Sequence, residues 1–151
     1  MKGAKLFMDK KEKDFPLRIL FLDDRTKRIH VAIERFQDHD LTIVTNVKEC
    51  LRHLSNNDYD LVSLDHDLNG IDFEDPDSSN VGMEVVRYLE KTGWPEAEGF
   101  DKKRPRFIVH SSNIFAAHLM VIRLKKIGFN AYWKRFEYSK KKMSDITETP
   151  K

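Results

Sequence analysis

The stretch "YDLVSLDHDL", residues 59–68, is the most informative part of the chain because a short apolar run leads directly into acidic and imidazole side chains. The run at 60–64 has the pattern of a buried β-strand rather than of a helix. Asp65, His66 and Asp67 follow its end without a spacer. The stretch therefore predicts a buried strand whose carboxyl end carries side chains suited to a metal ion.

A calcium-binding loop is one interpretation of this cluster. An EF-hand loop follows the pattern D-x-[DN]-x-[DN]-G-x5-E and lies between two helices. Asp65, Asp67, Asn69 and Gly70 match its first half, but its last position is Pro76, whose side chain has no ligand atom. The segment before Asp65 is also a predicted strand, so the sequence disfavours a calcium loop.

Apolar runs of similar length recur on both sides of this strand. "LRILFL" at 17–22 is continuous and apolar except for one arginine, and "LTIVT" at 41–45 is rich in β-branched residues. Both patterns are typical of strands within a sheet. The sequence predicts strands at 17–22, 41–45, 60–64, 105–111 and 130–136.

Helical patterns separate these strands. Ile29, Ile33 and Phe36 recur at helical spacing and give the first helix an apolar face. Asn46 and Glu49 form a capping box that begins the second helix. Helices are predicted at 25–36, 47–57, 80–93 and 113–128, and their alternation with strands predicts an α/β fold with a parallel sheet. One such domain is expected over 16–138, with polar tails at 1–15 and 139–151.

The composition is that of an ordinary soluble globular protein, with 40% hydrophobic and 34% charged residues. A net charge of +2 provides no strong field to attract duplex DNA or an acidic membrane. The single cysteine, Cys50, excludes an internal disulfide and is typical of a reducing compartment. No apolar stretch approaches the ~20 residues that span a bilayer. We expect a cytoplasmic protein with no membrane partner; the sequence carries no signal for an oligomeric state.

Polar side chains gather at the ends of four predicted strands. Ligands of open parallel sheets bind beyond the carboxyl ends of the strands. We therefore expect one shared rim to carry Asp23 and Asp24, then Asp65, His66 and Asp67, then His110, Ser111 and Asn113, and finally Lys134 and Arg135.

The carboxylates of this rim predict a divalent metal ion. Crowded carboxylates repel one another unless a cation neutralises them or some stay protonated. Oxygen ligands without a thiolate favour Mg²⁺ or Mn²⁺. Asp24, Asp65 and one of Asp23 or Asp67 are the predicted ligands. Such an ion orients a phosphate or lowers the pKa of a bound water.

The remaining rim residues suit a phosphate group. Lys134 and the adjacent Arg135 would contact phosphate oxygens as cations. Ser111 and Asn113 stand at a predicted helix start, where free N–H groups favour anions. Capping of that helix is an equally good interpretation of Asn113 taken alone.

Two histidines separate phosphate hydrolysis from phosphate binding. Cleavage of a phosphodiester needs an acid for the leaving oxygen or a base for water, and histidine titrates in the right range. His110 is the better candidate. His66 directly follows Asp65, so its side chain should point to the opposite face of a strand. A structural hydrogen bond explains His66 as well as a catalytic role does.

Across residues 17–136 the chain resembles a response-regulator receiver domain. The segments "FLDD", "LVSLD", "IVHS" and "WKRF" match receiver motifs at Asp23, Asp24, Asp65, Ser111 and Lys134. The resemblance implies a single-domain, flavodoxin-like, doubly wound sheet of five parallel strands. Only a polar tail follows Phe136, so the last helix of that fold is expected to be missing or short.

Finer features resemble a receiver-like family described as cyclic-phosphate processing. Its DD, DHDL, glycine-containing helix start and HSxN motifs match at Asp23, Asp24, Asp65, His66, Asp67, Gly82, His110, Ser111 and Asn113. Three positions depart from the usual patterns: Arg135 stands where receivers usually carry proline, and Ile114 and Ala116 stand where proline and glycine often follow HSxN.

The resemblance implies a metal-dependent phosphoesterase that uses Asp65, His110 and His66 in catalysis. Its substrate would be a cyclic nucleotide or an RNA end that bears a 2′,3′-cyclic phosphate. Two alternatives stay open: a signalling receiver that is phosphorylated on Asp65 and binds a protein partner, and a nucleotide-binding domain without catalysis.

Overall fold

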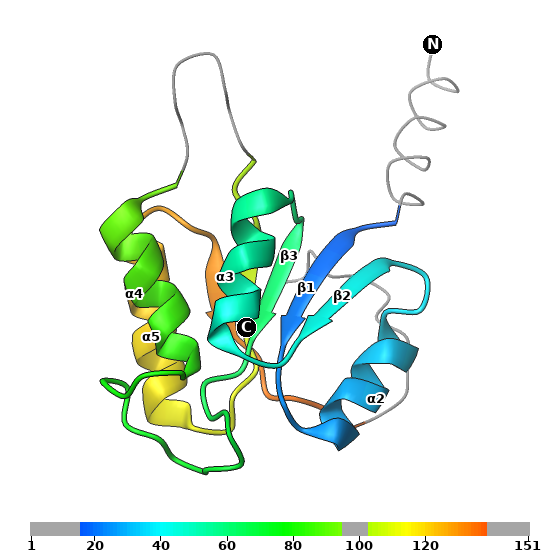
Figure 1. Cartoon of the computed structure of the whole chain (residues 1–151), viewed down its shortest axis with the longest axis horizontal. Helices are drawn as coiled ribbons and strands as arrows, with labels where there is room; N and C mark the ends of the chain where they lie inside the picture. The colour runs from blue at the N-terminus through cyan, green and yellow to red at the C-terminus, as the bar shows by residue number, and fades with distance from the viewer. Residues whose placement is uncertain (1–15, 95–102, 139–151) are drawn as a thin grey trace, which may run out of the picture.

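A computed structural model describes residues 16–94 and 103–138, so the predicted tails at 1–15 and 139–151 lie outside the described residues. Five parallel strands form one sheet in the order β2-β1-β3-β4-β5 (Figure 1). This confirms the predicted parallel sheet. The strands are β1 (Arg18–Leu22), β2 (Asp40–Val44), β3 (Leu61–Leu64), β4 (Arg106–Val109) and β5 (Ala131–Trp133).

Helices cover both faces of the sheet. The helices α3 (Val47–Asn56), α4 (Gly82–Thr92) and α5 (Ile114–Lys126) share one apolar core with the sheet, while α2 (Thr26–Arg35) packs in a second, smaller core (Figure 1). This is the doubly wound arrangement that the resemblance to receiver domains implies. In the described part of the chain, no helix has the length and apolar character that crossing a membrane requires.

Strand β1 shows why the sheet is buried on both faces. Its side chains alternate, so that Leu20 and Leu22 enter the larger core whereas Ile19 and Phe21 enter the smaller one. All four are at most 1% exposed. Burial of each such side chain stabilises the fold by about 1.5–3 kcal/mol. A continuous apolar run is therefore required here.

The register of the central strands brings the polar strand ends to one level. Leu22 of β1 pairs with Leu64 of β3, and Leu64 pairs with Val109 of β4. The residues that follow these three are Asp23, Asp65 and His110. Strand β2 lies on one side of β1, and β3 lies on the other. The ends of β1 and β3 therefore flank the switch point where ligands of such sheets bind.

Helix α2 turns a different face to the sheet from the one its apolar spacing predicts. Its buried residues are Arg28, Val31 and Ala32, and Phe36 directly after it is also buried. Ile33, predicted to lie on the apolar face, is 49% exposed. The helix is rotated so that the Arg28 guanidinium reaches the acidic strand ends, while Ile33 lies outside the interface.

The chain after β5 contains no helix up to Tyr138, the last described residue of this segment. The strand predicted to run to Phe136 ends at Trp133. Phe136 instead packs against the smaller core, with its ring 6.2 Å from that of Phe21 and 5.6 Å from that of His110. An irregular segment therefore lies on the α2 side of the sheet.

Candidate metal and phosphate site

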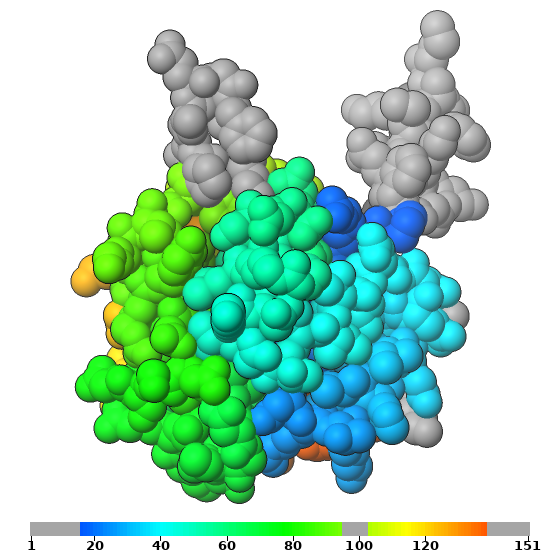
Figure 2. Space-filling view, in the orientation of Figure 1, coloured from blue at the N-terminus to red at the C-terminus, as the bar shows by residue number. Residues whose placement is uncertain are grey.

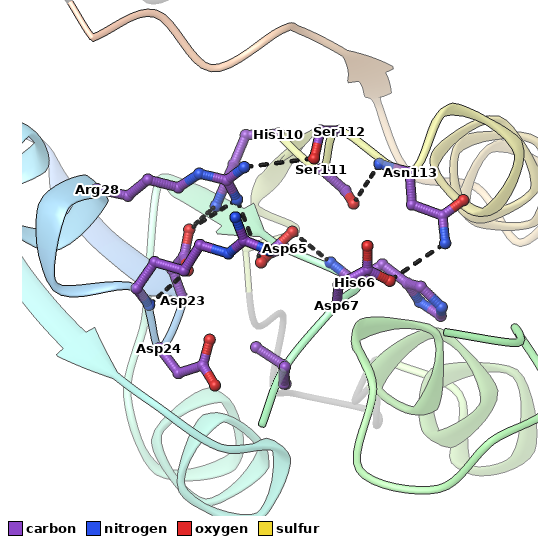
Figure 3. Close-up of polar contacts among 12 residues, drawn as sticks. Asp23, Asp24, Arg28, Asp65, His66, Asp67, His110, Ser111, Ser112 and Asn113 are labelled. Carbon is purple, nitrogen blue, oxygen red and sulfur yellow. Dashed lines mark hydrogen bonds and ion pairs between the residues drawn. The ribbon is translucent and has the colours of Figure 1, made fainter. Parts of the chain in front are cut away.

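Three carboxylates converge at the carboxyl ends of β1 and β3. Asp23, Asp24 and Asp65 each offer an oxygen, and these oxygens lie within 4.8 Å of one another (Figure 3). The backbone N–H of Asp65 donates to the carbonyl of Leu22 at 3.0 Å, so the sheet itself brings the two strand ends together.

Two buried oxygens of this cluster fit a cation. Among the described residues, Asp24 Oδ1 and Asp65 Oδ2 receive no hydrogen bond although both are shielded from solvent. A buried carboxylate oxygen without a donor is costly unless a cation lies beside it. The oxygens therefore fit a hard divalent ion such as Mg²⁺ or Mn²⁺.

Arg28 supplies a positive charge to the same cluster. Its Nη1 lies 3.4 Å from Asp23 Oδ2 and 3.3 Å from Asp65 Oδ2, and its side chain is 5% exposed. The sequence interpretation missed Arg28. A signal was present, because Arg28 stands four residues before Ala32 and eight before Phe36, and so shares their side of the helix.

Asp23 and Asp65 have opposite pKa shifts. Burial raises the pKa of Asp65 to about 6, with His110 opposing this rise and the charge of Asp23 adding to it. Burial also acts to raise the pKa of Asp23, but the hydrogen bond and charge of His110, the N–H of Arg25 and the guanidinium of Arg28 lower it overall. Two adjacent carboxyl groups with separated pKa values are typical of sites that handle protons.

His110 is the histidine that contacts the carboxylates. It follows β4, is 3% exposed and stacks on Phe21 with ring centroids 4.7 Å apart. Its Nε2 lies 3.0 Å from Asp23 Oδ2, and its Nδ1 lies 2.7 Å from the hydroxyl of Ser63. A hydroxyl donates or accepts, so it satisfies Nδ1 in either protonation state of the imidazole.

His66 has a different environment from His110. Its Nε2 contacts the carbonyl oxygen of Glu74 at 2.9 Å, and its Nδ1 accepts from the N–H of Met83 at 3.3 Å. The ring is fully buried between the loop after β3 and the start of α4. Both nitrogens are thus used to hold backbone, which favours the structural interpretation of His66 over the catalytic one.

Asp67 lies outside the carboxylate cluster. Its oxygens accept from the N–H groups of Phe73 and Glu74, both at 2.9 Å, and from Asn113 Nδ2 at 3.2 Å. The sequence left open whether Asp23 or Asp67 is the third metal ligand. The structure groups Asp23 with Asp24 and Asp65, whereas the carboxylate of Asp67 holds the following loop.

Asn113 connects that loop to helix α5. Its Oδ1 accepts from the N–H of Ala116 at 3.2 Å and so caps the helix, while its Nδ2 donates to Asp67 and to the carbonyl of Glu74. Ser111 is also fully buried, and its hydroxyl accepts a hydrogen bond from the N–H of Asn113 at 3.1 Å. The hydroxyl of Ser112 faces the guanidinium of Arg28 instead (Figure 3).

The loop at 69–80 forms a wall beside the carboxylates. The backbone N–H of Asn69 donates to Asp24 Oδ2. Across the loop, Asn69 Nδ2 donates to the backbone carbonyl of Asn80 at 3.3 Å, and Asn80 Nδ2 donates to Asn69 Oδ1 at 3.0 Å. Phe73 has a positive φ of 56° and is 76% exposed. In Figure 2 the loop forms the green lobe next to the blue surface of α2.

Gly82 allows the start of α4 to lie against the end of β3. A Cβ at this position would come within 1.9 Å of the carbonyl oxygen of Asp65 and 2.8 Å of the Cα of His66. The N–H of Gly82 donates to the carbonyl of His66 at 3.0 Å. Only glycine permits this approach, which sets the backbone that carries Asp65.

Lys134 and Arg135 follow β5 and are exposed, and neither forms an ion pair with a described residue. The N–H of Lys134 donates to the carbonyl of Val109 at 3.0 Å, which places its backbone next to the end of β4. The structure thus gathers three of the four polar strand ends around the carboxylates and leaves the fourth pair of side chains in solvent.

The family profile described as a cyclic-phosphate processing receiver domain matches residues 18–126. No curated protein sequence matches this chain. The matched segment contains the three carboxylates, Gly82, His110 and Asn113, but not Lys134 or Arg135.

Solved receiver structures share the fold. A CheY-like receiver domain from Methanospirillum hungatei JF-1 is 19% identical with a TM-score of 0.55, over 82% of this chain and 86% of that one. The response regulator protein TrrA from Thermotoga maritima, solved in complex with Mg²⁺-BeF, is 22% identical with a TM-score of 0.53, over 81% and 90% of the two chains. At these identities, the likeness extends to the fold alone.

Proposed function

The chain belongs to the family of cyclic-phosphate processing receiver domains, and from this we propose that it is a metal-dependent phosphoesterase. Its reaction is the hydrolysis of a cyclic phosphate or of a cyclic-nucleotide phosphodiester. The observation that carries the proposal is the contact between His110 and Asp23 inside the carboxylate cluster. A phosphoacceptor site requires no imidazole, whereas hydrolysis requires a group that stores a proton.

The carboxylates would hold the metal ion. Asp23, Asp24 and Asp65 supply oxygens from two adjacent strand ends, and two of these oxygens receive no hydrogen bond in the described structure. The ion would orient the phosphate and lower the pKa of a bound water.

His110 supplies the proton storage. Hydrolysis forms a P–O bond to the water oxygen and breaks the P–O bond to the leaving oxygen, which gains the proton that the water loses. His110 is too buried to meet substrate directly, so it acts through Asp23 Oδ2, 3.0 Å away. Ser63 permits both protonation states, because its hydroxyl donates to neutral imidazole and accepts from imidazolium.

The rim next to the carboxylates would receive the phosphate and its substituents. Ser112, just before α5, faces the Arg28 guanidinium, and Lys134 and Arg135 are exposed cations after the neighbouring strand. A cyclic nucleotide or an RNA end with a 2′,3′-cyclic phosphate presents such an anion. We propose these two substrate classes on the chemistry of the site.

A hydrolytic screen tests the proposal. Cyclic mono-, di- and oligonucleotides and RNA ending in 2′,3′-cyclic phosphate are incubated with Mg²⁺ or Mn²⁺, and the products are separated by chromatography. We expect turnover that requires the metal, is lost in Asp65→Asn, and falls by about 10²–10⁴-fold in His110→Ala. His30→Ala is the matched control, because His30 is exposed on α2. Turnover that survives Asp65→Asn contradicts the proposal.

A signalling receiver is the second candidate function. The receiver fold places Asp65 directly after β3, and its buried Oδ2 receives no hydrogen bond from a described residue, as a phosphoacceptor would require. Acetyl phosphate with Mg²⁺ would then label Asp65 stably, and mass spectrometry would locate the label. Stable labelling without turnover of any cyclic phosphate favours the receiver over the hydrolase.

A further inference from the structure

We propose that Arg28 is a phosphate-binding residue that exchanges its carboxylate contacts for a phosphate oxygen when a divalent ion binds the cluster. The inference rests on the proposed function in one respect, namely that the site binds a phosphate together with a metal ion. It adds a residue of α2 to a site otherwise built from strand ends (Figure 3).

The contacts of Arg28 in the structure are long for a charged donor. Its Nη1 lies 3.4 and 3.3 Å from oxygens of Asp23 and Asp65, and its Nη2 lies 3.4 Å from the hydroxyl of Ser112. Charge-assisted N–H···O bonds usually span about 2.7–2.9 Å. The guanidinium therefore balances the buried carboxylates without a tight bond to any of them.

A divalent ion and Arg28 compete for the same two carboxylates. Both cations need oxygens of Asp23 and Asp65, and the site is shielded from water, which strengthens repulsion between like charges. An ion on these oxygens would also neutralise the charge that holds the guanidinium. Metal binding thus releases the terminal nitrogens of Arg28 from the carboxylates. An anion that lies between the two cations would then hold both of them.

The rest of the side chain keeps Arg28 at the site after this release. Its Nε donates to the hydroxyl of Tyr138 at 3.1 Å, and its guanidinium carbon lies 5.6 Å from the centre of the Phe136 ring. Nη2 already faces Ser112, next to the start of α5. The terminal nitrogens therefore stay beside the cluster and can contact an anion that binds next to Ser112, and a guanidinium fork suits two phosphate oxygens.

Binding of Mn²⁺ with and without inorganic phosphate tests the inference. Electron paramagnetic resonance measures free Mn²⁺, so the readout is a dissociation constant and needs no turnover. In the wild-type protein we expect phosphate to tighten Mn²⁺ binding by about 5–100-fold, within the usual range of coupling between two sites. If phosphate leaves the Mn²⁺ affinity of the wild type unchanged, the inference is wrong, whatever any variant does.

Substitutions separate the two roles of Arg28. Arg28→Ala should bind Mn²⁺ alone about fivefold more tightly or better, because a competing cation is gone, and should lose the effect of phosphate. Weaker binding of Mn²⁺ alone, or coupling that survives, would overturn the inference. Arg28→Lys keeps the charge but lacks the fork, so Mn²⁺ alone should bind as in the wild type while the phosphate effect falls; it also decides the matter if Arg28→Ala does not fold.

Lys27→Gln is the matched control. It removes one positive charge from the neighbouring position of α2, but Lys27 is exposed and lies over the ring of Tyr138 rather than in the cluster. The affinity for Mn²⁺ should match that of the wild type both with and without phosphate. A loss of phosphate coupling as large as that in Arg28→Ala would show a general charge effect and overturn the inference. Coupling that depends on Arg28 in a protein that hydrolyses no cyclic phosphate would leave the inference intact and refute the proposed function.

Discussion

Asp23 and Asp65 are neighbouring carboxyl groups whose pKa values the protein shifts in opposite directions. The His110 imidazole and the Arg28 guanidinium both act on Asp23 and lower its pKa overall, against burial. Asp65 is buried with one oxygen that receives no hydrogen bond from a described residue, and burial raises its pKa to about 6. Arg28 and His110 offset this burial cost only in part, so the ionised form of Asp65 stays disfavoured in the metal-free protein.

Asp65→Asn should stabilise the metal-free protein near neutral pH. The pKa of Asp65 is raised to about 6 from 3.8, so the folded wild type binds this proton more tightly than the unfolded chain does. The stability that this provides is fully present below about pH 4 and is lost as the pH rises through 6. The gain of Asp65→Asn should thus be near zero at pH 4 and reach about 1–3 kcal/mol at pH 7.5. Urea unfolding in EDTA at both pH values measures it.

The control for this prediction is Asp60→Asn, at the opposite end of β3. Asp60 accepts from the N–H of Arg18 and pairs with Lys103, and although its partial burial opposes this, its pKa is lowered overall. This substitution should destabilise the protein at pH 7.5. A stability gain for Asp65→Asn that is equal at pH 4 and pH 7.5 would contradict the assigned pKa.

At the scale of elements, the site depends on how helix starts meet strand ends. Gly82 begins α4 against the backbone of Asp65, and Asn113 begins α5 while it holds the loop after β3. Helix α2 contributes through its rotation, which directs Arg28 inward. Each of these three helices thus positions one part of the site.

Gly82→Ala should destabilise the protein by about 2–3 kcal/mol, as overpacking of a core does. The added methyl group meets backbone atoms of Asp65 and His66, which cannot rotate away. Gly70→Ala is the comparison: Gly70 has a φ of +72°, but no described atom lies within 4 Å of the place its methyl group would take, so it should cost only about 1–2 kcal/mol of backbone strain. Chemical denaturation of both variants measures the difference, and an equal or smaller loss for Gly82→Ala would refute the steric argument.

Asn113→Ser should separate helix capping from loop attachment. Serine caps a helix as well as asparagine does. Its shorter side chain cannot also donate to Asp67 and Glu74, as Asn113 Nδ2 does. We expect stability within about 1 kcal/mol of the wild type but faster amide exchange of Phe73 and Glu74, measured by hydrogen–deuterium exchange. Unchanged exchange in the loop would show that Asp67 alone holds it.

At the scale of the whole molecule, one bound ion would join segments far apart in the chain. The oxygens that would hold it come from β1 and β3, and the groups around them come from α2, β4 and the start of α5. An ion that binds only this assembled arrangement stabilises the folded state by mass action.

Mg²⁺ should therefore raise the free energy of unfolding by about 2.7 kcal/mol at a concentration of 100 times its dissociation constant. Thermal and urea unfolding with Mg²⁺ or EDTA measure this gain. Asp24→Asn should abolish most of it, whereas Asp60→Asn, at the other end of the sheet, should keep it in full. A gain of equal size in both variants would mean that Mg²⁺ binds elsewhere.

The fold and the carboxylate cluster follow from local patterns. Apolar runs buried on both faces predict the strands, their alternation with helical spacing predicts the parallel sheet, and residues directly after the strands must lie at its carboxyl edge. Local sequence patterns are therefore enough to predict the sheet and the placement of Asp23, Asp24, Asp65 and His110 at one edge.

The tertiary structure decided the residues whose role depends on rotation or on distant partners. Arg28 enters the site because the packing of α2 on the sheet sets the rotation of the helix about its axis. The apolar spacing in the sequence had predicted that Ile33 would face the sheet, but Ile33 is exposed. Asp67 and His66 serve the loop and α4 because their partners, Glu74 and Met83, lie several residues further along a chain path that no local pattern specifies. Hydrophobic spacing identifies elements, but side-chain direction is set by contacts that form only on folding.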